Sequence, residues 1–371
     1  GMPEIFAGRK GPERGGCYLY GRHFNPTVYN VGRQLAALEG TEAAYCTASG
    51  MGAISAVIMA LCSAGDHVVA GDAIYGGTWA LLNDFMPAKT GVTTSFVNPC
   101  DPAAVASAIT DRTRLIYVES VANPTLRVPN LPALSRIARQ AGIPLVVDNT
   151  FAPLILSPAR LGADIVIHSL TKFISGASDL IGGAVCASNE FIGTLMDLHT
   201  GPLMVLGPTM DPHVAAEVGL RLPHLAVRMA AHSTRTLELA ERTAALGIKV
   251  GYPGLPSHPD HELMKSLYEP EFGFGGLMTI DAGSQVQAMR LLDILQNQER
   301  FGYVAVSLGY FDTLMSCSAV STSSEMSDDA LAQAEISPGL IRMAVGYTGS
   351  LEQRWGQLQR ALAAVGMAEA A

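Results

Sequence analysis

Short, uninterrupted runs of valine, isoleucine and leucine constrain the fold of this chain more than any other feature. Three of them are Leu115–Glu119, Leu145–Asp148 and Ala163–His168, and each ends in a polar residue. A strand with one solvated face alternates apolar and polar residues, whereas a strand covered on both faces is apolar throughout. These runs therefore predict central strands of a mostly parallel sheet.

Segments with helical character alternate with these strands. Gly50–Cys62 consists of small and apolar residues and predicts a helix, which the short strand His67–Ala70 follows. Leu131–Ala141 has helical spacing and is closed by the breaker Gly142-Ile143-Pro144. The alternation predicts an α/β fold with helices on both faces of the sheet.

The chain has 371 residues, which is more than one ordinary core holds. We expect an N-terminal arm over residues 1–23, a large domain over 24–218 and a smaller C-terminal α/β domain over 219–371. Gly219–His232 is expected to be a helix that connects the two domains. Strands of the smaller domain are expected at Phe274–Asp281, Val304–Ser307 and Leu340–Val345.

Composition excludes several functional classes. The formal charge is −9, from 24 Lys and Arg against 33 Asp and Glu, and no basic run is present, so nucleic acid is not an expected partner. The apolar stretches are far shorter than a bilayer span and no signal peptide opens the chain, so we expect a soluble protein and no membrane partner.

Six scattered cysteines in a chain of this size fit a reducing cytoplasm. Apolar residues make up 49% and charged residues 15%, which predicts surface buried against other copies of the chain.

Ligands of open α/β sheets bind beyond the carboxyl ends of the strands. Three polar strand ends are present: Glu119 followed by Asn123-Pro124, then Asp148-Asn149-Thr150, then His168-Ser169-Leu170-Thr171-Lys172. Lysine is rarely placed where its charge loses water. A lysine in such a place is a candidate for Schiff-base chemistry.

The motifs around Lys172 suit pyridoxal 5'-phosphate (PLP). Ser49-Gly50-Met51-Gly52 opens a helix, where free N–H groups and the helix dipole favour a phosphate, and Ser169 and Thr171 can add hydroxyl donors. Asp148 can pair with the pyridine nitrogen and keep it protonated, so that the ring accepts electrons from a substrate carbanion. Tyr75 can stack on that ring.

Taken singly, each motif has a simpler interpretation. Ser169-Leu170-Thr171-Lys172 also fits the S-x-x-K motif of serine acyl-transfer enzymes, although a strand precedes it and the S-D-N and K-T-G motifs are absent. Lys172 could be a surface lysine, Asp148 a helix cap, Tyr75 a core aromatic and Arg342 a surface ion-pair partner. No His, Cys or Asp cluster has metal-ligand spacing, so no metal is expected.

Together the motifs resemble the Cys/Met-metabolism family of PLP enzymes, which includes cystathionine γ-synthase, cystathionine lyases, methionine γ-lyase and O-acylhomoserine sulfhydrylases. The resemblance covers nearly the whole chain, and the order and spacing of the stretches make it specific. The stretches are Tyr20-Gly21-Arg22-His23-Phe24-Asn25-Pro26-Thr27, Ser49-Gly50-Met51, Tyr75-Gly76-Gly77-Thr78, Glu119–Pro124, Asp148-Asn149-Thr150, Ser169–Gly183, Ser307-Leu308-Gly309 and Gly339-Leu340-Ile341-Arg342.

The resemblance implies a PLP-dependent transferase-like fold of type I and a set of residue roles. In these roles Lys172 carries the cofactor as a Schiff base, Asp148 holds the pyridine nitrogen, and Tyr75 stacks on the ring and assists proton transfer. The implied phosphate ligands are Ser49, Gly50, Met51, Ser169 and Thr171. Arg342 is implied to bind the substrate carboxylate with help from Ser307 and Asn149, and Glu119 is a further candidate for substrate contact. Tyr20 and Arg22 are implied to complete the site of a neighbouring subunit, in a catalytic dimer that usually pairs into a homotetramer.

The implied reaction is the elimination of a thiol from methionine, cystathionine or a related amino acid, with Lys172 as the base that removes the α-proton. Two alternatives stay open. The first is γ-replacement on an acylated homoserine, as in an O-acylhomoserine sulfhydrylase or a cystathionine γ-synthase. The second is a PLP-binding protein with weakened catalysis, because Ala177 stands where the family usually has histidine and Pro223 stands where it usually has a basic residue.

Overall fold

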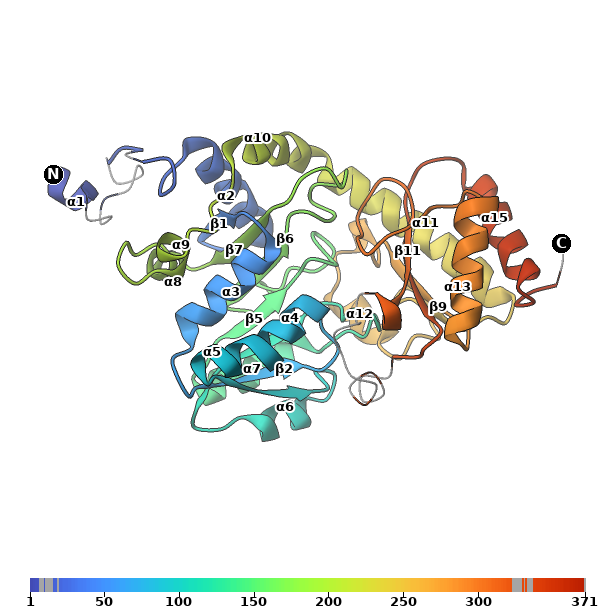
Figure 1. Ribbon diagram of the computed structural model, residues 1–371, viewed down its shortest axis with the longest axis horizontal. Helices are drawn as coiled ribbons and strands as arrows, with labels where there is room; N and C mark the ends of the chain where they lie inside the picture. Colours follow the sequence, from blue (N-terminus) through green and yellow to red (C-terminus); the bar gives the residue numbers. More distant parts are fainter. Residues whose placement is uncertain are drawn as a thin grey trace.

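The computed structural model describes residues 1–6, 10, 16–18, 20–321, 329, 331 and 336–369. Two β-sheets organise this part of the chain, one in each half of the molecule (Figure 1). The strands of the first sheet come from residues 43–187 and those of the second from residues 250–344. Two helices in succession, α10 (Pro212–Arg221) and α11 (Leu225–Ala245), lead from one half to the other.

The first sheet has seven strands in the order β1-β7-β6-β5-β4-β2-β3. The pairs from β6 to β3 are parallel, whereas β7 is antiparallel to both of its neighbours. The predicted mostly parallel sheet is confirmed. Its strands are β1 (Ala43–Thr47), β2 (His67–Gly71), β3 (Thr93–Val97), β4 (Thr113–Glu119), β5 (Leu145–Asp148), β6 (Ile165–Ser169) and β7 (Gly183–Ala187).

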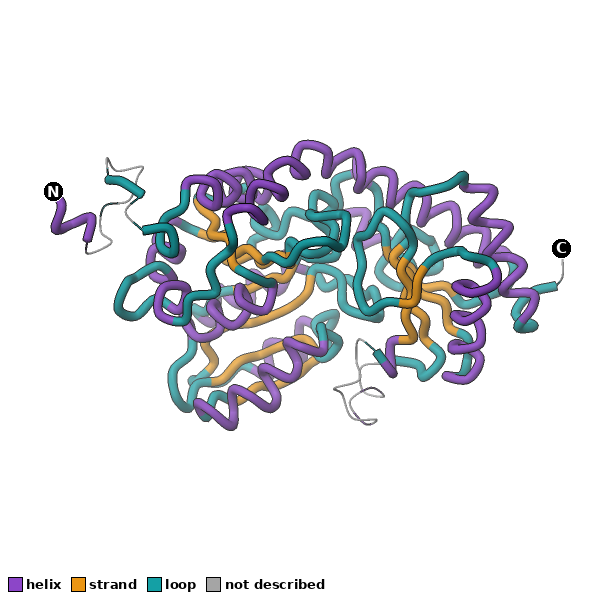
Figure 2. The backbone as a smooth tube through the Cα atoms, turned by 45° about the horizontal axis from the view of Figure 1, so that its top comes forward, coloured by secondary structure: helices purple, strands orange, loops and turns teal. Residues whose placement is uncertain are grey.

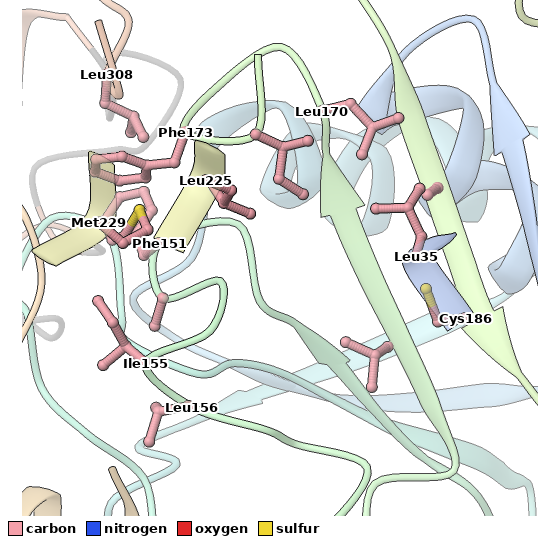
Figure 3. Packing of buried hydrophobic residues seen from close by; sticks show 14 of the residues in the cluster. Leu35, Phe151, Ile155, Leu156, Leu170, Phe173, Cys186, Leu225, Met229 and Leu308 are labelled. Atoms are coloured by element: carbon pink, nitrogen blue, oxygen red, sulfur yellow. The ribbon is translucent and has the colours of Figure 1, made fainter. Parts of the chain in front are cut away.

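Helices cover both faces of this sheet because its apolar strands present side chains to both (Figure 2). Leu115 and Tyr117 of β4 pack with α3 (Gly50–Leu61), whereas Ile116 and Val118 point the other way and pack with α7 (Leu131–Ala141). Over β6 and β7, the face of the sheet that carries α7 is covered by α2 (Pro26–Glu39) and α10. Figure 3 shows this packing at Leu35 of α2, which lies next to Cys186 of β7. The remaining helices of this half are α1 (Met2–Phe6), α4 (Gly76–Ala80), α5 (Met86–Thr90), α6 (Pro102–Ala108), α8 (Asn189–Leu195) and α9 (Pro202–Val205), with a π-helical turn at Leu81–Phe85.

The second sheet has five strands in the order β10-β11-β12-β9-β8 and is antiparallel except for the pair β10 and β11. Its strands are β8 (Val250–Gly251), β9 (Leu277–Asp281), β10 (Tyr303–Val304), β11 (Leu314–Cys317) and β12 (Leu340–Ala344). Met278 and Ile341 on this sheet pack against Leu239 of α11, Leu291 of α13 (Gln285–Asp293) and Leu358 of α15 (Leu351–Ala364). The other helical segments are α12 (His261–Leu267), a π-helical turn at Ile294–Gln298 and 3-10 turns at Pro270–Phe272 and Ser318–Val320.

The expected helices and strands are found with small shifts at their ends, and two expectations need correction. The helix expected over Gly219–His232 is interrupted, because a 3-10 turn at Leu222–His224 separates α10 from α11. Pro223 in that turn cannot donate the backbone hydrogen bond that a continuous helix requires. The strand expected over Val304–Ser307 is only the two residues of β10. The domain boundary expected at residue 219 falls inside α10 and stays a prediction.

Within the described residues, no helix is both long and apolar enough to cross a membrane.

Candidate active site

A cavity of about 240 Å³ opens where the carboxyl ends of β4, β5 and β6 meet a loop and a strand of the second sheet. These three strands are neighbours, and Glu119 and Asp148 are partners in the register of β4 and β5, so their side chains are brought together. The lining residues are Ser49, Gly50, Met51, Ile54, Tyr75, Glu119, Val121, Asn123, Asp148, Thr150, Phe151, Ser169, Thr171, Lys172, Ile181, Val306, Leu308 and Arg342. Most of the predicted site residues therefore share one cavity.

Asp148 ends β5 as a buried carboxyl that is held on both oxygens. Its Oδ1 accepts hydrogen bonds from Thr150 N at 3.0 Å and Thr150 Oγ1 at 2.5 Å, and its Oδ2 accepts one from Tyr117 OH at 3.2 Å. Burial raises the pKa of the Asp148 carboxyl above its ordinary value, and the bonds from Thr150 oppose that rise by stabilising the anion. Thr150 Oγ1 also accepts a bond from Ser169 N at 2.8 Å, so it joins the end of β5 to the end of β6.

Lys172 follows β6. All five lysines of the chain lie in the described residues, and Lys172 is the one among them that lines the cavity. Its Nζ donates a hydrogen bond to Ser307 Oγ at 3.0 Å, from a loop of the second half. Burial, together with the nearby charge of Arg342, lowers the pKa of Lys172 to about 8. About a tenth of the amine is therefore neutral and nucleophilic at pH 7 and about half at pH 8, far more than for a lysine with the ordinary pKa.

The start of α3 forms the wall opposite the end of β6. Ser49 caps the helix by accepting a hydrogen bond from Gly52 N at 3.0 Å. A methyl group added at Gly50 would lie 2.9 Å from Ser169 Cβ, closer than real contacts allow, so this wall requires glycine. Ser169 and Thr171 face the same space, and a helix start with hydroxyl groups beside it is suited to a phosphate.

Arg342 of β12 is 2% exposed and brings a cation from the second sheet into the cavity. It donates to Asn123 Oδ1 at 3.0 Å and to Ser307 O at 3.2 Å, which fix its guanidinium plane. Burial lowers the pKa of Arg342 to about 10, and the charge of Glu119 opposes that shift. A fixed guanidinium at this place can bind a carboxylate.

Glu119 ends β4 and lies under the loop that carries Tyr75. Its carboxyl accepts hydrogen bonds from Tyr75 N and Asn123 N, both at 2.8 Å. Burial and the neighbouring Asp148 raise the pKa of Glu119 well above its ordinary value. Glu119 thus fixes the backbone of both Tyr75 and Asn123, and its side chain also faces the cavity.

Tyr75 is 44% exposed, and its ring leans over Gly77. A methyl group added at Gly77 would lie 2.6 Å from Tyr75 Cε1, so this ring position depends on the glycine. The exposed ring is positioned at the cavity and is available to cover a planar ligand.

Four predicted residues are not among those that line the cavity of their own chain. Tyr20 is exposed, and Arg22 donates to Met204 O at 2.5 Å and lies 5.8 Å from the centre of the Tyr20 ring. Asn149 is fully buried and faces away, because its amide donates to Glu39 Oε1 and Leu156 O and its oxygen accepts a bond from Ser120 Oγ. The structure therefore does not bring the Asn149 side chain into the cavity that Arg342 lines. Ser307 does not line the cavity but reaches it through Lys172 Nζ.

Three residues that contact the central groups were absent from the predicted set. Tyr117 stands two residues before Glu119 in β4, so strand alternation places both on one face. Thr150 comes two residues after Asp148, and Asn123 comes four residues after Glu119. Tyr117 could have been predicted from the alternation of side chains along β4. Thr150 and Asn123 could have been predicted from their place in the loops that follow two strand ends.

Comparison with known proteins decides the family. The family model described as "Cys/Met metabolism PLP-dependent enzyme" matches residues 5–361. The chain belongs to this family. It is therefore a PLP-dependent enzyme of sulfur amino-acid metabolism.

Several relatives of the chain have names within this family. A methionine γ-lyase of Arabidopsis thaliana is 55% identical over 361 residues, which cover 97% of this chain and 82% of that protein. An O-succinylhomoserine sulfhydrylase of Pseudomonas aeruginosa is 37% identical, over 94% of this chain and 84% of the relative. Among solved structures, a cystathionine γ-synthase of Xanthomonas oryzae pv. oryzae in complex with aminoacrylate and cysteine has a TM-score of 0.87 at 32% identity, and the match covers 93% of this chain and 87% of that one. These neighbours confirm the predicted fold type.

The cavity fits the cofactor of this family on its own geometry. It holds Lys172, the carboxyl of Asp148 with hydrogen bonds to both of its oxygens, and a helix start that tolerates no side chain at Gly50. These are the groups that an aldehyde, a basic ring nitrogen and a phosphate require.

Two residues depart from the family pattern, Ala177 and Pro223. Each lies in a segment that a contact of Arg221 joins to the other. Arg221, which precedes the 3-10 turn of Pro223, binds both oxygens of Asp179 at 2.5 and 2.8 Å and also donates to Ser175 Oγ at 3.1 Å. A basic side chain is therefore still attached to the turn that contains Ala177.

Proposed function

We propose that the protein is a carbon–sulfur lyase that uses PLP to eliminate a thiol from methionine or a closely related amino acid. The observation that carries the proposal is the position of Lys172, whose Nζ enters a cavity that also holds Asp148 and Arg342. The 55% identity to a methionine γ-lyase supports this reaction over the others in the family.

At the cofactor end, Lys172 is the proposed covalent attachment point, and Asp148 is proposed to hold a proton on the ring nitrogen. The hydroxyls of Ser169 and Thr171 and the start of α3 at Gly50 would bind the phosphate, while Tyr75 would cover the ring. When bound, PLP supplies an electron sink that stabilises negative charge on substrate carbon.

At the substrate end, Arg342 would bind the α-carboxylate through its planar fork. That contact would hold the Cα–H bond near Lys172 Nζ, which would accept the α-proton. After a second proton is taken from Cβ, the γ-sulfur would leave as a thiol with one of these protons, the other would return to carbon, and addition of water would give ammonia and a 2-oxo acid. The depressed pKa of Lys172, about 8, suits an amine that must both accept and return protons.

The side chains that line the remaining space favour an uncharged substrate side chain. Val121, Phe151, Ile181, Val306 and Leu308 are apolar, and Arg342 and Lys172 are the cations among the described lining residues. With Lys172 committed to the cofactor, Arg342 is the one described cation of the same chain that remains in the cavity for a carboxylate. A succinyl group or the second amino-acid head of cystathionine would need a further charged partner.

We also propose that the active unit is a homodimer, with tetramers of paired dimers, in the cytoplasm. Tyr20 and Arg22 lie outside the cavity of their own chain, which suits a role in a neighbouring subunit. All six cysteines lie in the described residues and are free thiols, which suits a reducing compartment.

A substrate panel tests the reaction. Purified enzyme with PLP is given methionine, cystathionine and O-acetylhomoserine, the last with and without sulfide, and ammonia and 2-oxo acid are measured. We expect both products from methionine at the highest rate. Sulfide-dependent consumption of O-acetylhomoserine without 2-oxo acid would instead identify a γ-replacement enzyme. Visible cofactor absorbance with no product from any substrate would identify a PLP-binding protein with weakened catalysis.

The Lys172→Ala variant tests the role of the lysine. We expect loss of turnover and of the visible absorbance of the bound cofactor, and turnover at the wild-type rate would refute the proposed base.

A further inference from the structure

The turn that follows Lys172 is held from behind by a buried arginine of α11 that the proposed mechanism does not use. Arg228 is 7% exposed. It donates to Phe173 O through Nη1, to Ile174 O at 2.8 Å through Nη2, and to His224 Nδ1 at 2.9 Å through Nε. Two of its acceptors are therefore the carbonyl groups directly after Lys172.

A fourth contact joins this arginine to the interruption between α10 and α11. Nη2 also donates to Arg221 O at 3.3 Å, at the last residue of α10. Helix carboxyl ends leave carbonyl groups unpaired and carry partial negative charge, which stabilises a cation there. Pro223 interrupts the helix at this point, and Arg228 thereby acquires acceptors for its buried charge.

Burying the charged guanidinium of Arg228 costs free energy, which suggests that the side chain has a specific role. Burial lowers the pKa of Arg228 below its ordinary value. In the described part of the chain its hydrogen-bond partners are carbonyl oxygens and an imidazole, none of them a carboxylate. Neutral acceptors offset only part of the loss of water around a cation.

The turn approaches Arg228 so closely that its own sequence is constrained. Gly176 has φ of +75°, and a methyl group there would lie 2.3 Å from Arg228 Nη1. A methyl group at Gly309 would lie 2.4 Å from Phe173 N and 2.7 Å from Lys172 C. The backbone of the lysine turn is thus approached closely by both the guanidinium and the loop of Ser307-Leu308-Gly309.

Apolar packing surrounds the same turn. Figure 3 shows Phe173 beside Leu308, with Met229 and Leu225 of α11 close by, and all four belong to one buried cluster. One turn beyond Arg228, His232 contacts the Phe173 ring edge to face at 5.1 Å and bonds to Val345 O through Nδ1 at 2.6 Å. The helix α11 therefore contacts both the lysine turn and the strand segment that follows Arg342.

We propose that Arg228 is a positioning residue for Lys172: by fixing the carbonyl groups of Phe173 and Ile174, it sets the place of Nζ relative to Ser307 and Arg342. This inference rests on the proposed role of Lys172. Arg228 does not touch the cavity and acts only through the turn.

The Arg228→Lys variant, which keeps the charge and loses the planar fork, and the Arg228→Met variant test this role. Arg242→Lys is the matched control, since Arg242 lies on the same helix and pairs at the surface with Glu238 and Glu352. We expect both Arg228 variants to lower kcat by about 10- to 100-fold, the scale of a misplaced catalytic group, with little change in KM. The control is expected to match the wild type.

A readout independent of turnover separates positioning from simple structural support. PLP is added to the apoprotein at a series of pH values, and the rate at which the visible absorbance appears is measured. If the turn loosens, water reaches Nζ, and the pH midpoint of this rate moves to a higher value in both Arg228 variants. A lower melting temperature with unchanged kcat and an unchanged midpoint would overturn the proposal.

Gly176→Ala gives a second route to the same contact and keeps the test informative if Arg228→Met does not fold. The added methyl group displaces the guanidinium, so we expect the same shift of the midpoint. In the Arg228→Lys background the two effects are expected to be less than additive, because they remove one interaction. Full additivity would contradict a shared mechanism. If Lys172→Ala retains turnover, the proposed function fails, whereas loss of turnover in Lys172→Ala with wild-type behaviour of the Arg228 variants refutes only the positioning role.

Discussion

Thr150 offers the sharpest test of how the cavity holds its cofactor. Its hydroxyl donates to Asp148 Oδ1 at 2.5 Å and accepts from Ser169 N at 2.8 Å. One side chain therefore stabilises the carboxylate that would face the ring nitrogen and also fixes the strand end that leads to the phosphate ligands. Thr150→Val removes the hydroxyl and keeps the shape of the side chain.

The size of the effect follows from the lost bond to the carboxylate. A hydrogen bond to a charged group contributes about 1.5–3 kcal/mol. A protonated ring nitrogen binds the anionic form of Asp148, so the variant is expected to bind PLP about 10- to 150-fold more weakly. The assay is the dissociation constant of PLP from the apoprotein, obtained by equilibrium dialysis.

Thr150→Ser is the matched control because it keeps the hydroxyl, and we expect its affinity to stay near that of the wild type. Melting temperatures of the apoproteins separate the loss of affinity from a loss of folded protein, since Ser169 N also loses a partner in Thr150→Val. Wild-type affinity in a folded Thr150→Val protein would refute the assignment of Asp148 to the ring nitrogen.

Three further predictions address other walls of the cavity. In Gly50→Ala, the added methyl group meets Ser169 Cβ at 2.9 Å, so PLP is expected to dissociate faster. The rate is measured as the loss of visible absorbance on dilution, and an unchanged rate would exclude a phosphate at this helix start. Burial depresses the pKa of Lys172 to about 8, and only the neutral amine reacts with an aldehyde. The rate of PLP attachment to the apoprotein is therefore expected to rise through about pH 8 and then level off. A midpoint near the pKa of a free lysine would contradict the buried position. In Arg342→Lys, the planar fork is lost and the charge is kept, so KM for methionine is expected to rise by about tenfold or more with a smaller effect on kcat, and an unchanged KM would remove Arg342 from carboxylate binding.

The strand ends could be predicted because each is marked by a local pattern. An apolar run followed by an acid or by a serine and a lysine identifies a buried strand and the edge where it ends, as at Asp148 and Lys172. The parallel order of β4, β5 and β6 then brings these ends together without further information. Helix α7 was predictable because local patterns mark it as well. Its amphipathic spacing indicates a helix, and Gly142 marks its carboxyl end.

The contacts behind these ends could not be predicted in the same way. Asn149 follows Asp148 directly, yet its side chain points away from the cavity to Glu39, a residue 110 positions earlier in the chain. Arg228 is one of many arginines in the sequence, and only the fold shows that it is buried against Phe173 and Ile174. Side-chain partners this far apart in sequence are fixed by packing, which a local pattern does not contain.

The central claim is that Lys172 Nζ carries the cofactor. Reduction of the PLP-treated protein with borohydride, followed by digestion and mass spectrometry, locates the attached group among five lysines. The account predicts one modified peptide, the one that contains Lys172. Modification at Lys10, Lys89, Lys249 or Lys265 instead, with Lys172 unmodified, would contradict it.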